Sequence, residues 1–161
     1  MSEIRLRRGL PSDIDFCMTT ERLPGYDVLT ACWTEVEHLR ALELVDTRYL
    51  MGGYASGPLF GFAIVERVND PHEGAKLKRI AVTQPAVGFG VPFLRAVIGW
   101  VFESTAAPRL WLDVFVHNAR ARHVYRKVGM REDGLLRQAY VQPNGERVDR
   151  VIMSVLRTEW L

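Results

Sequence analysis

Residues 118–129 read Asn118-Ala119-Arg120-Ala121-Arg122-His123-Val124-Tyr125-Arg126-Lys127-Val128-Gly129 and predict one short amphipathic helix. Asn118 is a favourable N-cap residue, and Gly129 suits the left-handed position that ends a helix. One face carries the apolar side chains that we expect to pack on a sheet, namely Ala121, Val124 and Val128. A second face, at spacings of four and three, carries Asn118, Arg122 and Tyr125. Taken alone, this segment predicts a half-buried tyrosine and a row of solvated arginines.

A glycine-containing loop, Gln84-Pro85-Ala86-Val87-Gly88-Phe89-Gly90, lies between an expected strand and an expected helix. The start of a helix offers unpaired main-chain N–H groups and the positive end of the helix dipole, and glycine lets an anion approach the main chain. Pro92 fits the first helical turn, where its missing N–H has no partner to lose. The loop therefore favours phosphate binding, and its alternative interpretation is a simple turn. It is no P-loop, because no Gly-Lys-Ser/Thr follows, and it lacks the third glycine of a dinucleotide fingerprint.

The other helices and strands are predicted from the periodicity of apolar and polar residues and from the turn residues that separate these segments. We expect strands at 3–8, 49–55, 59–68, 75–83, 110–116, 131–142 and 146–156, and helices at 11–20, 34–44, 91–103 and 118–128. In the second helix Thr34 and Glu37 have the spacing of a capping box. Its inward residues are predicted to be Val36, Leu39, Ala41 and Leu42. Hairpins in the first half and strand–helix–strand units in the second predict an α/β fold, with one mixed sheet and helices on both faces.

Length and composition indicate a single domain over residues 1–161. Hydrophobic residues make up 48% of the chain and charged residues 25%, as is ordinary for a folded protein. A net charge of +2 argues against nucleic-acid binding. The cluster of arginines between 120 and 131 is the one feature in favour of such binding. The two cysteines, Cys17 and Cys32, have no CxxC partner and no histidine at metal-ligand spacing, so we expect free thiols, no metal and a cytoplasmic location. No segment predicts a signal peptide or a membrane span.

Together, four segments resemble the GNAT acetyltransferase superfamily. They are the strand end Ile80-Ala81-Val82, the Gly88-x-Gly90 loop, the strand Trp111-Leu112-Asp113-Val114, and Asn118-x-x-Ala121-x-x-x-Tyr125-x-x-x-Gly129-Met130. The chain end, with Gly134-Leu135-Leu136-Arg137, Asp149, Met153-Ser154 and Glu159-Trp160, looks like the branch of ribosomal-protein N-terminal acetyltransferases. The resemblance is clear over 77–160, and earlier residues match only in element order.

The resemblance implies a mostly antiparallel sheet of about seven strands with a V-shaped splay between strands 4 and 5. It also implies an acetyl-CoA-dependent N-acetyltransferase that modifies a primary amine on a small molecule or a protein N-terminus. Tyr125 would be the catalytic acid that protonates the departing thiolate of CoA. The residues that would contact acetyl-CoA are Ile80, Ala81, Val82, Val87, Gly88, Phe89, Gly90, Val91, Asn118, and Arg126 or Lys127. A phenol suits the role of acid because its ordinary pKa of about 10 keeps it protonated at neutral pH.

The sequence departs from the family pattern in two places. The phosphate loop has Pro85 and Val87 where the family usually has polar or basic side chains. The strand before the loop reads Lys76-Leu77-Lys78, where some members have a catalytic glutamate. Glu66, Glu73 and His72 are the candidate replacements for the general base, and a chain of water molecules is another. Pro85 and Val87 in the phosphate loop motivate an alternative function, a degenerate domain that binds CoA or a metabolite without catalysis.

The acceptor amine is not defined by the sequence. Its pocket should lie between the first two helices and the last hairpin. An acidic set, Glu35, Glu37, Glu43 and Asp46, would suit a cationic amine, although an exposed charged helix face explains these residues equally well. Candidate acceptors are a protein N-terminus, a polyamine or an antibiotic-like amine. We expect no nucleic-acid or membrane partner, and the resemblance allows a homodimer.

Overall fold

The structure is a computed structural model that describes residues 3–26, 32–85 and 87–160. Its strands are β1 (Ile4–Arg8), β2 (Arg48–Tyr54), β3 (Leu59–Glu66), β4 (Ala75–Val82), β5 (Arg109–Phe115), β6 (Arg131–Val141) and β7 (Arg147–Leu156). Its α-helices are α1 (Ile14–Glu21), α2 (Glu35–Glu43), α3 (Gly90–Ser104) and α4 (Ala119–Lys127), with 3-10 turns at Pro11–Asp13 and Arg157–Glu159. The strands form one seven-stranded sheet in the order β1-β2-β3-β4-β5-β7-β6. The predicted α/β fold and the order of its elements are confirmed.

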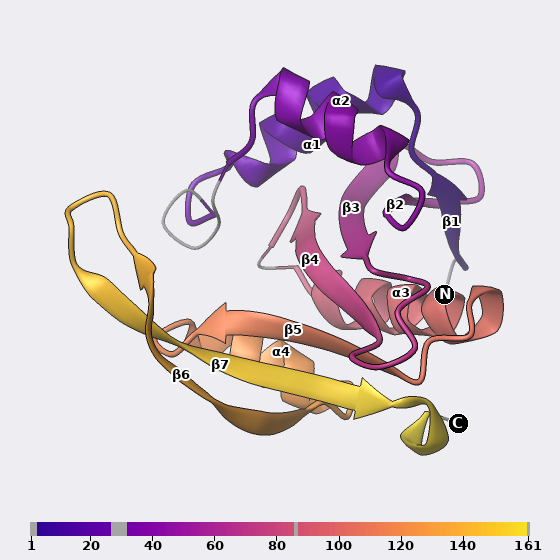
Figure 1. Cartoon of the computed structure of the whole chain (residues 1–161). Helices are drawn as coiled ribbons and strands as arrows, with labels where there is room; N and C mark the ends of the chain where they lie inside the picture. Colours follow the sequence, from indigo (N-terminus) through magenta and orange to yellow (C-terminus); the bar gives the residue numbers. More distant parts are fainter. Residues whose placement is uncertain (1–2, 27–31, 86, 161) are drawn as a thin grey trace.

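The centre of the sheet is split between β4 and β5, which run parallel while the other neighbouring strands are antiparallel. The two strands pair at Ala75 with Leu110 and at Lys76 with Trp111, and the described residues beyond these pairs do not continue the ladder. Figure 1 shows the strands separating from this point like the arms of a V. The split leaves main-chain groups of both strands without a strand partner, and this is where a ligand can reach them.

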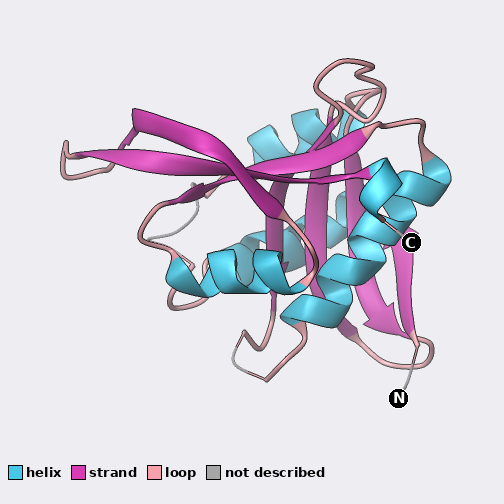
Figure 2. Cartoon of the chain, turned by 90° about the horizontal axis from the view of Figure 1, so that it is seen from below, coloured by secondary structure: helices cyan, strands magenta, loops and turns pink. Residues whose placement is uncertain are grey.

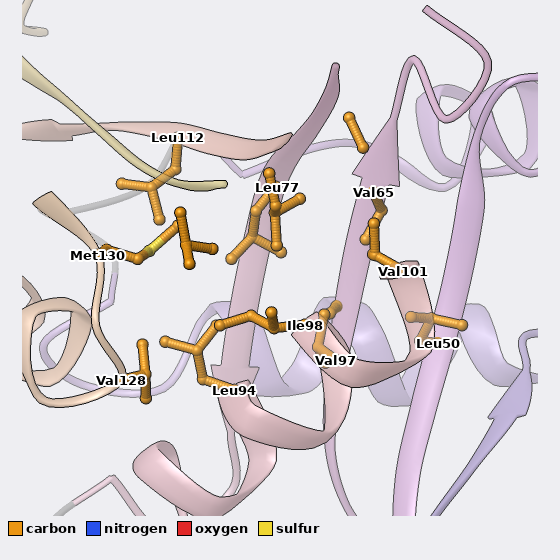
Figure 3. Close-up of a cluster of buried hydrophobic side chains, with 14 of the residues drawn as sticks. Leu50, Val65, Leu77, Leu94, Val97, Ile98, Val101, Leu112, Val128 and Met130 are labelled. Carbon is orange, nitrogen blue, oxygen red and sulfur yellow. The ribbon is translucent and has the colours of Figure 1, made fainter. Parts of the chain in front are cut away.

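Helices cover both faces of the sheet, as Figure 2 shows. The helices α3 and α4 pack on the larger core, which includes residues from β2 to β5 and from β7. Figure 3 shows α3 side chains such as Leu94 and Ile98 pointing toward Leu77 and Leu112 of the strands. The smaller core lies under α1 and α2 on the opposite face. The predicted packing face of residues 118–128 is also confirmed, because Val128 belongs to the larger core and the partly buried Ala121 and Val124 pack against it.

Helix α3 comes close to the sheet because glycines lie beneath it. A Cβ atom added to Gly52 of β2 would lie 2.4 Å from Cε2 of Phe93, and one added to Gly61 of β3 would lie 3.0 Å from Cε1 of the same ring. Phe93 is fully buried in the larger core. The distance between α3 and the sheet therefore depends on the absence of a side chain at Gly52 and Gly61. The position of the loop that leads into α3 depends on it too.

Helix α2 begins as predicted but faces the core with a different residue. The side chain of Thr34 accepts a hydrogen bond from the N–H of Glu37, whose carboxylate accepts one from the N–H of Thr34. The prediction that Val36 points inward is wrong, because 55% of Val36 is exposed, whereas His38 is fully buried. The burial of His38 requires polar partners, and the structure supplies them.

A buried polar network joins α1, α2, β2 and β4. The carboxylate of Glu21 is hydrogen-bonded to Nε2 of His38 at 2.8 Å and accepts a hydrogen bond from Nη1 of Arg79 at 2.8 Å. Nδ1 of His38 lies 2.7 Å from the hydroxyl oxygen of Tyr49. Burial alone would raise the pKa of the Glu21 carboxyl, but the hydrogen bond to His38 and the charge of Arg79 outweigh burial, so its pKa lies below the ordinary value. The network fixes α1 and α2 against the strand that leads to the split.

In the part of the chain that the structure describes, no helix is both long and apolar enough to span a membrane.

Candidate active site

A cavity of about 430 Å³ fills the V between β4 and β5. Its walls come from both strands, from the loop before α3, from α4, and from Pro24–Tyr26 of the segment that follows α1. Tyr140 and Arg150 of the last hairpin close one side. The volume lies within the usual range of small-molecule sites. Most of the residues that sequence analysis selected are therefore brought to one place.

The main chain of β4 presents alternate residues to the cavity. The N–H of Thr83 donates to the carbonyl of Phe60 on β3, whereas the N–H of Val82 points the other way and donates to the hydroxyl of Tyr26. By the alternation of a strand, Ile80 shares the orientation of Val82, and the main-chain groups of Ala81 face β3. All three residues line the cavity. Ile80 and Val82 therefore direct main-chain N–H and C=O groups into the cavity. Ala81 lines the cavity but offers it no main-chain hydrogen bond.

The loop before α3 places two glycines against the cavity. Gly88 adopts a φ of +87°, a conformation that L side chains rarely tolerate. Gly88, Gly90 and Val91 line the cavity near the start of α3, where helix N–H groups lack intrahelical partners. Val87 and Phe89, which were also predicted to contact acetyl-CoA, do not line the cavity. The N–H of Val87 donates to Gln84 within the turn, the ring of Phe89 stacks on Phe60, and Ala86 lies outside the described residues.

Helix α4 contributes a capping asparagine, a tyrosine and cationic side chains. Oδ1 of Asn118 accepts the N–H of Ala121 at 3.2 Å, so the residue both caps the helix and lines the cavity. Lys127 lines the cavity, whereas Arg126 does not and donates to Glu132 at 2.6 Å. Of the two predicted phosphate ligands, the structure therefore brings only Lys127 to the site. Sequence reasoning missed Arg120 and His123, which also line the cavity from α4.

Tyr125 lies on the cavity wall between α4 and the split strands. Burial raises the pKa of its hydroxyl, and the neighbouring Tyr26 and Asp113 raise it further. Both effects disfavour the phenolate, so Tyr125 remains a protonated phenol throughout the neutral range. A group in this state can donate a proton but cannot serve as a base near neutral pH.

The side of the cavity formed by β5 and the last hairpin carries charged and aromatic residues that sequence reasoning did not select. Asp113 of β5 forms ion pairs with Nζ of Lys76 at 2.9 Å and with Nη1 of Arg150 at 3.1 Å. The rings of Phe115 and Tyr140 pack against one another with centroids 4.9 Å apart. The sequence does carry a signal for two of these residues. Asp113 and Phe115 alternate along β5 with the buried Leu112 and Val114, so their side chains point to the opposite face of the sheet.

The candidate bases and the acidic set from the sequence do not reach this site. Glu66, Glu73 and His72 are absent from the cavity lining, and Glu73 is paired with Arg67. Glu35, Glu37, Glu43 and Asp46 do not line the cavity either. Among the described residues that line the cavity, Asp113 supplies the only carboxylate.

A family model described as Acetyltransferase (GNAT) family matches residues 17–130, which is more than half of the chain. The chain therefore belongs to the GNAT acetyltransferase family. A [ribosomal protein bS18]-alanine N-acetyltransferase of Haemophilus influenzae is 34% identical over 98 residues. That alignment covers 60% of this chain and 64% of the relative, so less than two thirds of the relative's length is matched.

Solved structures share the fold across nearly the whole chain. A spermidine N-acetyltransferase from Vibrio cholerae, in complex with CoA and spermine, superposes with a TM-score of 0.84 at 21% identity and covers 98% of this chain and 97% of its own. The ribosomal-protein-S18-alanine N-acetyltransferase from Escherichia coli gives a TM-score of 0.73 at 22% identity, with 96% and 94% covered. The expected mixed, mostly antiparallel seven-stranded sheet of the GNAT fold is thus confirmed.

Proposed function

We propose that residues 1–161 act as one domain that transfers an acetyl group from acetyl-CoA to a primary amine. The observation that carries the proposal is the position of Tyr125, a protonated phenol, on the same cavity as the inward-facing main chain of Ile80 and Val82. Family membership supports the use of acetyl-CoA, whose thioester supplies the acyl group. The residues present fit this co-substrate, because helix N–H groups and three cationic or potentially cationic α4 side chains, Arg120, His123 and Lys127, line the cavity and suit phosphates.

The reaction forms a C–N bond to the amine and breaks the C–S bond of the thioester. The N–H of Ile80, directed into the cavity, is placed to stabilise the charge that develops on the carbonyl oxygen. The hydroxyl of Tyr125 donates its proton to the departing sulfur. None of the carboxylates predicted as a base lines the cavity, so we propose that the proton of the amine leaves through water.

The loop favours a weaker alternative, in which the domain binds CoA without catalysis. Among the described residues of the loop, Pro85, Gly88 and Gly90 line the cavity, and Val87 is exposed and does not line it. The loop contains no lysine or arginine, so it adds no cation of its own. The cations of α4 replace what the loop lacks, which favours binding strong enough for turnover.

The test combines calorimetry and turnover. We expect acetyl-CoA to bind at tens of micromolar or below, and we expect release of free CoA thiol with at least one amine of a broad panel. Tyr125→Phe should lower kcat about 100-fold or more and leave the acetyl-CoA Kd unchanged. Tyr54→Phe is the matched control, because Tyr54 packs on Phe60 outside the cavity.

Each negative result has a separate meaning. No acetyl-CoA binding would overturn the enzyme proposal, and binding without turnover would favour the non-catalytic alternative. An unchanged kcat in Tyr125→Phe would remove Tyr125 from the role of acid.

We also propose a cytoplasmic location and a homodimer. Cys17 and Cys32 are both free, which suits a reducing compartment. The edge strand β6 exposes Leu135 and Leu136, which suits contact with a second copy. Sedimentation equilibrium would detect the dimer, and a Leu136→Glu variant should shift the mass toward the monomer.

A further inference from the structure

The cationic side chains on the cavity form two groups that lie on different elements. Arg120, His123 and Lys127 belong to α4, beside the loop and the start of α3. The second group, on β4 and β7, consists of Lys76, Lys78, Arg79 and Arg150. Coenzyme phosphates at the helix N-terminus account for the first group. The second group lies on the acceptor side and needs a different explanation.

In the part of the chain that the structure describes, the carboxylates near the second group do not balance its charge. Arg79 is paired with the buried Glu21, and the two charges cancel. Lys76 and Arg150 share the single carboxylate of Asp113. No carboxylate of the described residues lies within ion-pair distance of Lys78. Counted over the described residues alone, this side therefore carries four cationic side chains against the carboxylates of Glu21 and Asp113, an excess of two positive charges.

The backbone directs Lys78 to this position. The pairing of β3 with β4 shifts register between Ile64 and Val65, so that Lys78 is an extra residue between the buried Leu77 and Arg79. Such bulges commonly re-aim a side chain beside an active site. The cavity is lined by Lys78 as a result, and its ammonium lies 6.0 Å from the ring centroid of Trp33.

Arg150 offers a second, independent donor. Its Nη1 is bound to Asp113, while its Nε is buried and has no hydrogen-bond partner among the described residues. The edge of the guanidinium formed by Nε and Nη2 is the edge that binds carboxylate or phosphate through two parallel hydrogen bonds. A buried donor without a partner is costly, and an anionic ligand would satisfy it.

We propose that the acceptor is a small primary amine that also carries an anionic group, which binds between Lys78 and the free edge of Arg150. This inference rests on the proposed function and narrows its substrate class. A polyamine would meet two excess positive charges in the same place. The aromatic pair of Phe115 and Tyr140 provides an apolar wall beside Arg150 for the short chain that joins amine and anion.

The test compares four amines of similar length with the intact protein and acetyl-CoA: β-alanine, 2-aminoethyl phosphate, β-alaninamide and 1,3-diaminopropane. We expect kcat/KM for at least one of the two anionic amines to exceed that for the amide and the diamine about tenfold or more. The carboxylate and the phosphate arms identify which anion is preferred. Lys78→Gln should reduce the ratio of kcat/KM for the anionic amine to that for the amide about tenfold, and Arg150→Lys should reduce it also, since the forked edge is lost.

Arg5→Gln is the control for a lost positive charge, because Arg5 is exposed on β1 and should keep both the activity and the ratio. Equal or better turnover of the diamine would overturn the inference and leave the proposed function standing. A ratio unchanged in both cavity variants would also overturn it. Failure of all four amines and of the broad panel, with acetyl-CoA bound, would instead contradict the proposed function itself.

Discussion

The hydroxyl oxygen of Tyr26 accepts a hydrogen bond from the main-chain N–H of Val82 at 3.0 Å. Val82 ends the strand whose inward N–H groups are expected to hold the pantetheine arm. The phenol of Tyr26 therefore stands where a ligand carbonyl would be received. It also lies close enough to Tyr125 to influence the charge state of that phenol.

The first prediction concerns this hydrogen bond. Tyr26→Phe should bind acetyl-CoA about two- to tenfold more tightly, because the ligand no longer has to displace a protein hydroxyl from Val82. Calorimetry with acetyl-CoA measures the change, with Tyr54→Phe as the control for loss of a phenolic oxygen. Weaker binding in Tyr26→Phe would show instead that the hydroxyl holds the ligand.

The second prediction separates the two cations at the end of α4. Lys127→Ala should weaken acetyl-CoA binding several-fold and reduce its dependence on salt, because Lys127 lines the cavity. Arg126→Ala should leave the Kd within about twofold, because Arg126 is held by Glu132 outside the cavity. Titrations at low and high salt test the pair, and an equal loss in both variants would contradict the assignment.

The third prediction is that Glu21→Gln strongly destabilises the fold. The change removes the carboxylate that pairs with the buried Arg79, and breaking a buried ion pair typically costs about 3–5 kcal/mol of unfolding free energy. Because the folded-state pKa of Glu21 is depressed, its stabilising effect is complete above the ordinary carboxyl value of about 4.5 and is lost as the pH falls below it. Urea unfolding between pH 3 and pH 7 should therefore show that the wild type and Glu21→Gln differ in their free energy of unfolding, and that this difference becomes smaller in acid. The exposed pair in Glu132→Gln is the control, and it should cause a much smaller change.

The fourth prediction concerns the packing of α3. Gly52→Ala should lower the unfolding free energy by about 1–3 kcal/mol, because the new methyl group overlaps the ring of Phe93. Gly99→Ala, in open space on the same helix, should raise it by up to about 1 kcal/mol through helix propensity. Denaturant melts of both variants check the signs. Equal effects would mean that the sheet yields to the methyl group at no cost.

Local patterns sufficed to predict the elements. The cap at Asn118, the glycine at 129 and the alternation in the strands are short-range signals, and the structure follows them to within a few residues. The error at Val36 has a long-range cause. His38 is buried in its place because Glu21 and Tyr49 satisfy its ring nitrogens, and no local pattern reveals partners so distant in the sequence.

The candidate site was predicted unevenly for the same reason. Main-chain groups do not depend on distant side-chain partners, so the family resemblance was enough to indicate Ile80, Val82 and the glycines of the loop. The contribution of Tyr26 depends on a contact with Val82 across 56 positions, and that of Arg150 on strand pairing beside Asp113. A bulge re-aims Lys78, and bulges leave no clear signature in a single sequence.

The short ladder between β4 and β5 has a consequence for how the chain folds. Antiparallel neighbours join β1 through β4 in sequence order, and β5 to β7 form a second group that is local in sequence. Two residue pairs and the packing of α3 link these groups. Because local contacts form before distant ones, we expect each group of strands to form its hairpins independently. The pairing of β4 with β5 should then form last. The cavity would then be the final part of the molecule to take shape, and a ligand that binds there would act on the slowest step of assembly.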